Sequence, residues 1–292
     1  MNTNNKSYNK AFYLLTLLFF LWGFITVLVD SLIPRLRELF TLTYFEAGLV
    51  QFAFFGAYFL LSIPASFILS KIGYKRGIIL GLLTMAFGCL LFYPAASFRV
   101  FGIFIVAYFI LAGGITLLQV AANPYVAVLG TEDKASSRLN LSQAFNSLGT
   151  AIAPAIGALF ILSDTIKSSN QIQQLTEIEK QSYYASEAAA VQYPFLGLAL
   201  FIILIALVFF FVKLPKLINE SQTGSYKEVL KNKRVVLGVL GIFFYVGAEV
   251  AIGSYLINYF LDMNLDEVIK NSDTMSSIAA SLLNSDLALK DS

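Results

Sequence analysis

The sequence predicts an all-α membrane protein, and two observations carry this prediction. Of the 292 residues, 58% are hydrophobic and only 13% are charged, whereas a typical soluble domain is about 25% charged. The apolar residues also gather in seven runs, each about 20 residues or longer, which is the length that a helix needs to cross roughly 30 Å of hydrocarbon. Both observations place lipid around most of the chain.

The predicted spans are runs bounded by charged residues or by Gly and Pro turns. The first run is too long to be a removable signal peptide, and it has no small-residue cleavage site before its polar end. The second and third flank a short basic loop, the fourth and fifth carry the most polar side chains, and the sixth and seventh flank a longer basic stretch. In order, the spans cover 11–33, 45–69, 77–97, 100–128, 138–162, 193–213 and 235–260.

The spans divide the chain into four predicted parts. With a cytoplasmic N-terminus, the inner loops hold 13 of the 20 cations, and the positive-inside rule favours this orientation in the inner membrane. The last segment contains no further apolar run, so the chain has seven predicted spans. A transporter built of two repeated halves has an even number of spans, and we therefore expect a truncated form. The parts are a six-helix bundle (1–213), a cytoplasmic basic linker (214–234), the seventh span (235–260) and a polar non-cytoplasmic segment (261–292).

The composition also excludes several classes of function. The sequence has no His, and its single Cys, Cys89, lies inside an apolar run. A His/Cys metal site, a disulfide framework and a Ser-His or Cys-His catalytic pair are therefore excluded, and we expect neither an enzyme nor a cofactor. The net charge of +2 is small and dispersed, so nucleic acid is not an expected partner.

One acidic residue lies in the outer part of the first span. Trp22, Thr26 and Asp30 recur every four residues and so share a helix face. A carboxylate inside a membrane costs about 2.5–3.5 kcal/mol on insertion scales, which makes Asp30 a candidate for binding a proton or a sugar hydroxyl. An equally weighted interpretation leaves Asp30 near the outer interface, solvated or paired with Arg35 or Arg37.

A second acidic residue, Glu249, lies in the middle of the seventh span, one turn after Tyr245. It is a candidate second titratable group. The alternative is a neutral, hydrogen-bonded acid that only packs helices.

The fourth and fifth spans each carry a polar face. Amides both donate and accept hydrogen bonds, which suits a ligand made of hydroxyl groups. The same amides also serve as hydrogen-bonding contacts between membrane helices, worth about 0.6 kcal/mol each, and the spacing does not choose between these roles. The residues are Thr116, Gln119 and Asn123 in the fourth span and Asn140, Gln143, Asn146 and Ser147 in the fifth.

Three stretches resemble a known family. They are the run from Phe20 to Pro34 around Trp22 and Asp30, the Gln-Val-Ala-Ala-Asn-Pro run from Gln119 to Gly130, and the Arg-Leu-Asn-Leu-Ser-Gln-Ala-Phe-Asn run at 138–146. Together they resemble the fucose permease and glucose/galactose transporter branch of the major facilitator superfamily, over nearly all of 11–262. The resemblance implies a fold of twelve spans in two six-helix halves, of which this chain holds the N-terminal half and a seventh helix. It also implies proton-coupled sugar symport.

Carried over to this chain, the family's first-span acid matches Asp30, implicated in proton coupling, and an amide of its sugar cavity matches Asn146. Where the fucose permease has a membrane Glu, this chain has Gln119, which can bond a sugar but cannot carry a proton. This departure favours glucose or galactose over fucose, and it leaves Asp30, with Glu249, in the titratable role.

The family's loop between the second and third spans is also matched, at Lys71, Gly73, Lys75 and Arg76, where it implies a cytoplasmic gate. Ser70 stands where the family has an Asp. The contact that this Asp makes with a helix dipole in the family is therefore weakened in this chain. The basic residues equally serve the positive-inside topology.

The resulting prediction is secondary active transport of a hexose of the glucose, galactose or fucose type, by alternating access and proton symport. The partners are a sugar, a proton or a sodium ion, and the lipid bilayer. Two alternatives remain open, a seven-span receptor or sensor and a non-transporting truncated membrane subunit. The predicted sugar-binding residues are Trp22, Thr26, Gln119, Asn123, Gln143 and Asn146.

Overall fold

The computed structural model describes residues 2–30, 44–160, 172, 174–215, 226–263, 271–272, 274–275 and 277. Every regular element in these ranges is a helix. The chain forms two compact units, Met1–Gln222 and Thr223–Ser292.

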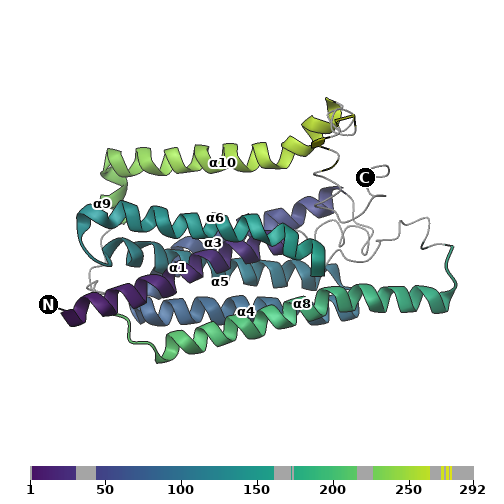
Figure 1. Ribbon diagram of the computed structural model, residues 1–292, viewed down its shortest axis with the longest axis horizontal. Helices are drawn as coiled ribbons and strands as arrows, with labels where there is room; N and C mark the ends of the chain where they lie inside the picture. Colours follow the sequence, from purple (N-terminus) through teal and green to yellow (C-terminus); the bar gives the residue numbers. More distant parts are fainter. Residues whose placement is uncertain are drawn as a thin grey trace. The chain divides into compact units, whose positions relative to one another are not determined.

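Six long helices of the first unit run lengthwise side by side (Figure 1). The end of the bundle where α1 begins is called here the N-terminal end. A short 3₁₀ helix, Glu132–Lys134, joins α5 to α6 at this end. The long helices are α1 (Asn2–Asp30), α3 (Tyr44–Ile72), α4 (Tyr74–Phe98), α5 (Phe101–Val128), α6 (Ala135–Phe160) and α8 (Glu177–Phe211).

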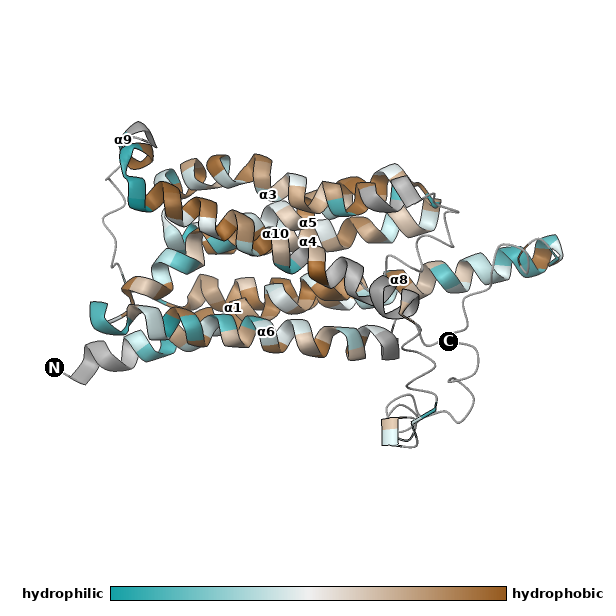
Figure 2. Cartoon of the chain, turned by 90° about the horizontal axis from the view of Figure 1, so that it is seen from above, coloured by the Kyte–Doolittle hydropathy of each residue, from teal (hydrophilic) through white to brown (hydrophobic). Residues whose placement is uncertain are grey.

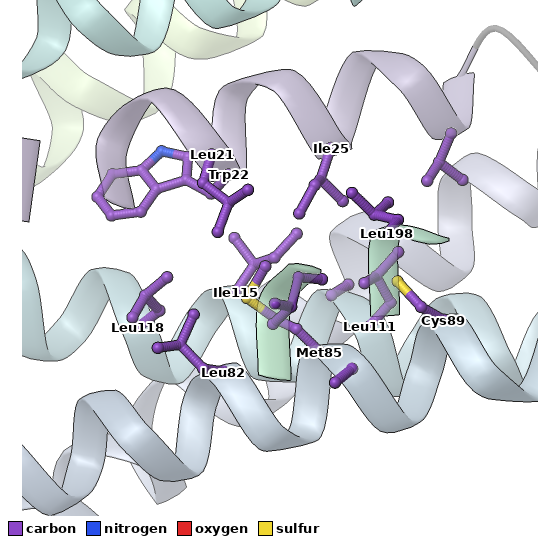
Figure 3. Close-up of a cluster of buried hydrophobic side chains, with 14 of the residues drawn as sticks. Leu21, Trp22, Ile25, Leu82, Met85, Cys89, Leu111, Ile115, Leu118 and Leu198 are labelled. Carbon is purple, nitrogen blue, oxygen red and sulfur yellow. The ribbon is translucent and has the colours of Figure 1, made fainter. Parts of the chain in front are cut away.

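The helices pack in two connected groups. α4 lies against both α5 and α8, while α3 packs on the other side of α5. α1 pairs with α6, and smaller contacts of α5 with α1 and α6 join the two groups. The buried core between them is almost wholly apolar: Figure 3 shows Leu21, Ile25, Leu82, Met85 and Ile115 directed toward one another.

Glycines allow these helices to approach closely. A Cβ atom added at Gly114 of α5 would lie 2.5 Å from the Met85 amide nitrogen of α4, and one at Gly149 of α6 would lie 2.4 Å from the Phe20 carbonyl oxygen of α1. Close contact through small residues is typical of membrane helices, since no water-driven force holds them together.

Five of the described helices are long and apolar enough to cross a membrane: α1 over Tyr8–Val29, α3 over Leu49–Ile72, and the whole of α4, α5 and α8. Hydrophilic colour in Figure 2 gathers at the N-terminal end and along the projecting start of α8. α6 covers most of the predicted fifth span, and its described part carries several amides and hydroxyls.

The sixth helix is longer than the sequence predicts. α8 starts at Glu177 and not near residue 193, so much of the expected outer loop is helical. The Thr176 hydroxyl accepts a hydrogen bond from the Glu179 amide, and the Glu179 carboxylate accepts one from the Thr176 amide at 2.9 Å. This capping box satisfies amides at the helix start and explains the early beginning.

The second unit contains α9 (Tyr226–Lys231) and α10 (Lys233–Asp262), and α10 includes all of the predicted seventh span. Between the two helices, the Asn232 side-chain oxygen accepts a hydrogen bond from the Arg234 amide at 3.1 Å. Asn at this position satisfies an amide of the first turn of α10.

Candidate substrate-binding site

Asn146 of α6 contacts the backbone of α1. Its Nδ2 donates a hydrogen bond to the Phe19 carbonyl oxygen at 2.9 Å. Gly23 makes room for this amide, because a Cβ at position 23 would lie 2.5 Å from Asn146 Nδ2. Further along the same contact, the buried hydroxyls of Thr16 and Ser142 lie 3.4 Å apart. The nitrogen of Asn146 therefore links α1 to α6, while its oxygen is chemically suited to accept a bond from a ligand.

Trp22 and Thr26 share a face of α1, as their spacing predicts. Trp22 is only 4% exposed, and its ring centroid lies 4.1 Å from that of Phe19. The Thr26 hydroxyl donates to the Trp22 carbonyl oxygen at 2.8 Å, a bond within the helix. Figure 3 shows the indole beside the buried cluster that contains Leu118. In this structure Trp22 contributes to core packing.

The polar face of α5 reaches toward α3. Gln119 Nε2 donates a hydrogen bond to the hydroxyl of Tyr58 at 3.1 Å, and the Tyr58 ring packs against Phe54 with centroids 5.0 Å apart. One turn further along α5, Asn123 Oδ1 is buried and has no hydrogen-bond partner, the one such side-chain atom in the described part of the chain. A buried acceptor without a partner costs about 1–3 kcal/mol, so this oxygen is a candidate for binding a ligand hydroxyl.

α6 presents a polar face that is not covered by its neighbours in the first unit. Asn140, Gln143 and Ser147 are exposed and follow one another at spacings of three and four residues. Polar side chains within a membrane usually face a cavity or another polar helix, because lipid offers them no hydrogen bonds. This face and the α5 amides are the polar surfaces of the candidate site.

The two acidic residues predicted for coupling are not brought into this site by the described contacts. Asp30 is the last residue of α1, and its side chain lies outside the described part. Glu249 belongs to α10 in the second unit, where it is exposed. Among the described residues no group of His, Cys, Asp or Glu could hold a metal ion.

The loop between α3 and α4 lies at the N-terminal end. Gly73 has a φ of 80°, a conformation that favours glycine, and its amide donates to the Leu69 carbonyl oxygen to close α3. The Lys75 ammonium donates to the Phe210 carbonyl oxygen near the end of α8 at 2.8 Å, where the helix dipole favours a cation. The Ser70 hydroxyl bonds within its own helix, and Lys71 and Arg76 are exposed.

Sequence reasoning missed the structural role of Arg138. Its guanidinium donates to the carbonyl oxygens of Val126 at 3.1 Å, Thr131 at 3.0 Å and Ala127, which end α5 and begin the following loop. A cation at these terminal carbonyls satisfies acceptors that the helix leaves unpaired. A hydrogen bond from the Thr131 side chain lowers the pKa of the exposed Asp133 carboxyl in the same loop.

A bundle of long apolar helices with polar faces on two of them is the architecture of a multi-pass membrane protein. The chain belongs to the Major Facilitator Superfamily, whose family model matches residues 14–285.

Similar proteins agree with this assignment. The chain is 47% identical over 263 residues to a glucose/galactose transporter of Brucella abortus, a match that covers 89% of this chain and 60% of the relative. It is 50% identical over 264 residues to a putative glucose/galactose transporter of Helicobacter pylori (90% and 61%), and 40% identical over 267 residues to the L-fucose-proton symporter of Escherichia coli (88% and 61%). The predicted family and branch are confirmed, and these relatives are transporters, not enzymes.

The fold is also that of a solved transporter. The crystal structure of a variant of the Escherichia coli fucose:proton symporter FucP superposes with a TM-score of 0.78 at 38% identity, covering 88% of this chain and 64% of that one. A second FucP structure, in the outward conformation, gives the same TM-score at 39% identity and the same coverage. The chain thus spans about 60% of the length of its curated relatives.

Proposed function

We propose that this chain acts in secondary active transport of a hexose, of the glucose, galactose or fucose type, by alternating access with proton symport. Support comes from the relatives, two of which bear the name glucose/galactose transporter and one the name L-fucose-proton symporter. The observations that carry the proposal are the exposed amide face of α6 and the amides of α5, two helices that contact each other. Such a face inside a membrane suits a solute rich in hydroxyls.

The hydrogen bonds of the site suggest how a sugar is recognised. Because the nitrogen of Gln119 donates to Tyr58, its oxygen is left to accept from a ligand. The unpartnered Asn123 Oδ1 lies one turn along the same face. The Cβ atoms of residues four apart on a helix are about 5–6 Å apart, so we propose that the two oxygens accept from two hydroxyls of one sugar. Gln143 of the exposed α6 face, Asn146, Thr26 and Trp22 complete the proposed set.

Asp30 is proposed to couple transport to protons, with Glu249 as a second acid. Protonation removes the cost of a carboxylate in the membrane and so lets the halves of the transporter move. The chain is proposed to lie in the inner membrane with its N-terminus in the cytoplasm. The loop containing Lys71, Gly73 and Arg76 then serves as the cytoplasmic gate, held to α8 by Lys75.

The test uses cells that lack hexose uptake and express this chain. Glucose, galactose or fucose is added singly to a weakly buffered suspension, while external pH and entry of labelled sugar are followed. Alkalinisation with one sugar supports proton symport and identifies the substrate. Sugar entry that requires sodium and leaves pH unchanged would replace the proton by sodium.

Variants separate coupling from binding. Asp30→Asn is expected to abolish uphill accumulation while sugar exchange continues, and Glu249→Gln tests the proposed second acid in the same way. Uphill accumulation by Asp30→Asn would exclude Asp30 as the coupling group. No flux from a chain that is inserted in the membrane would favour a receptor or a non-transporting subunit.

A further inference from the structure

An apolar groove with a cavity volume of about 230 Å³ lies where α3, α4 and α5 meet. Its walls come from Leu61, Pro64 and Ile68 of α3, Leu80 and Thr84 of α4, and Gly113 of α5. Ile68 and Leu80 are each 40% exposed, so the groove opens on the outside of the first unit.

Local sequence explains why the helices leave this space. Pro64 lies inside α3 and has no amide hydrogen, so it removes one backbone hydrogen bond of that helix. Gly113 contributes no side chain, and a Cβ there would lie 2.7 Å from Leu61 Cδ1. The Thr84 hydroxyl is turned back onto the Leu80 carbonyl oxygen at 2.9 Å, which leaves an apolar surface toward the groove. The lining is therefore apolar although it contains a hydroxyl.

Positive charge lies at one end of the groove. Lys71 follows Ile68 by three residues on α3, and Arg76 precedes Leu80 by four residues on α4, so both cations lie about one turn beyond the lining toward the N-terminal end. Both side chains are exposed. Lys75 is not part of this pair, because its ammonium binds the Phe210 carbonyl oxygen of α8.

An apolar groove that runs from the helix ends toward the middle of the span, with cations at its mouth, has the shape and charge of a lipid. We propose that this groove binds an anionic phospholipid, with one acyl chain in the groove and the phosphate at Lys71 and Arg76. The cavity is too small for a helix, which is about 10–12 Å across with its side chains. Basic sites between membrane helices are a recognised means of binding anionic headgroups.

The headgroup, and not the acyl chain, supplies the selectivity. Lipid tails are as apolar as the groove, so an acyl chain gains little free energy by moving from the bilayer into the groove. Each cation near an anionic membrane surface is worth about fivefold in binding. An anionic lipid is therefore expected in the groove at least about fivefold more often than a zwitterionic lipid with the same tails.

A second groove of the first unit serves as an internal control. It has a cavity volume of about 270 Å³ and an equally apolar lining, which includes Phe24, Leu28 and Phe201. The nearest charged residue along α1 is the acidic Asp30. This groove should take both lipids equally.

The experiment labels the full chain in phosphatidylcholine vesicles. One sample contains a small fraction of phosphatidylglycerol with a photoreactive group in its acyl chain, and a second sample contains the same fraction of phosphatidylcholine with that group. Adducts on the protein are located by mass spectrometry. Adducts on 61–68 and 80–84 should be at least about fivefold more frequent with phosphatidylglycerol. The enrichment should disappear in Lys71→Gln/Arg76→Gln and persist in Lys231→Gln/Lys233→Gln, which alters exposed cations of the second unit.

A third variant tests the groove itself. Thr84→Leu fills the space without changing a charge, and it should remove the adducts of both lipids from 61–68. Protection of the buried Cys89 thiol shows that each variant is folded. Three results would each overturn the proposal: equal labelling by the two lipids, enrichment that survives Lys71→Gln/Arg76→Gln, or a groove labelled by neither lipid while the second groove is labelled. The last result would assign the groove to a protein segment.

Discussion

The contact between α4 and α5 at Gly114 gives the sharpest stability prediction. A Cβ there would lie 2.5 Å from the Met85 amide nitrogen and 2.7 Å from the Gly81 carbonyl oxygen, whereas an ordinary contact begins at 3.4 Å. Both neighbours are backbone atoms, so no side-chain rotation relieves the clash. Gly114→Ala therefore forces the two helices apart by several tenths of an ångström.

The loss of unfolding free energy caused by Gly114→Ala can be bounded. Inserting a methyl group into a well-packed core typically costs about 1–3 kcal/mol, while Gly→Ala inside a helix gains up to about 1 kcal/mol. Gly197, inside α8, has nothing within 4 Å of its added Cβ, so Gly197→Ala should show the helix gain alone. Subtracting the change in unfolding free energy of Gly197→Ala from that of Gly114→Ala removes the contribution of helix propensity. The remaining difference should be about 1–3 kcal/mol, or roughly 2–12 °C in the unfolding midpoint.

Cys89 provides the assay. It is the only cysteine of the sequence, it is fully buried, and it lies one turn after Met85 on α4. A dye that fluoresces on reaction with thiols therefore reports the opening of this contact during heating in detergent. Gly114→Ala should react at a lower temperature than Gly197→Ala. The same or a higher midpoint for Gly114→Ala would refute the reasoning.

Three further predictions concern polar contacts. Tyr58→Phe removes the hydrogen-bond partner of the Gln119 amide nitrogen. The KM for sugar uptake should therefore rise about threefold, which corresponds to roughly 0.6 kcal/mol, while kcat changes little. An unchanged KM would show that Tyr58 does not position Gln119. Arg138→Gln removes a charged donor from carbonyls at the end of α5 and should lower the free energy of unfolding by about 2 kcal/mol, measured by thermal unfolding. The control Arg76→Gln, at an exposed side chain, should change this free energy little. The lowered pKa of Asp133 means that its stabilising contribution is complete above the unfolded value of about 3.9 and is lost as pH falls through the folded value. Unfolding followed by tryptophan fluorescence should therefore show a smaller loss on acidification in Asp133→Asn than in the parent, and equal losses would contradict this.

Hydrophobic length was enough to predict most of the helices. In the described part of the chain, each predicted span lies on a helix, because runs of about 20 apolar residues have no other stable arrangement in lipid. Hydropathy did not find the first turns of α8, since Thr176 and Glu179 are polar and act through capping. Hydropathy also does not show which glycines permit close helix contacts: Gly149 does, while Gly102 faces open space.

The site could be predicted only in part, for a physical reason. Periodicity shows which residues share a face of one helix, and the pairs Trp22 with Thr26 and Gln119 with Asn123 follow from it. It cannot show which helix that face meets. The bond from Asn146 to the Phe19 carbonyl oxygen joins residues 127 positions apart, and nothing local in the sequence indicates it.

The polar face of α6 has a consequence for biogenesis. The described part of α6 carries more amide and hydroxyl side chains than its partner α1 does over Tyr8–Val29. α1 is synthesised more than 100 residues earlier, so it is already available when α6 leaves the ribosome. Their close contacts at Gly23 and Gly149 are then expected to help retain this more polar helix in the membrane. Substitutions on this side of α1 should therefore appear first as failed membrane integration of α6, with degradation of the chain, before any change in a mature protein is seen.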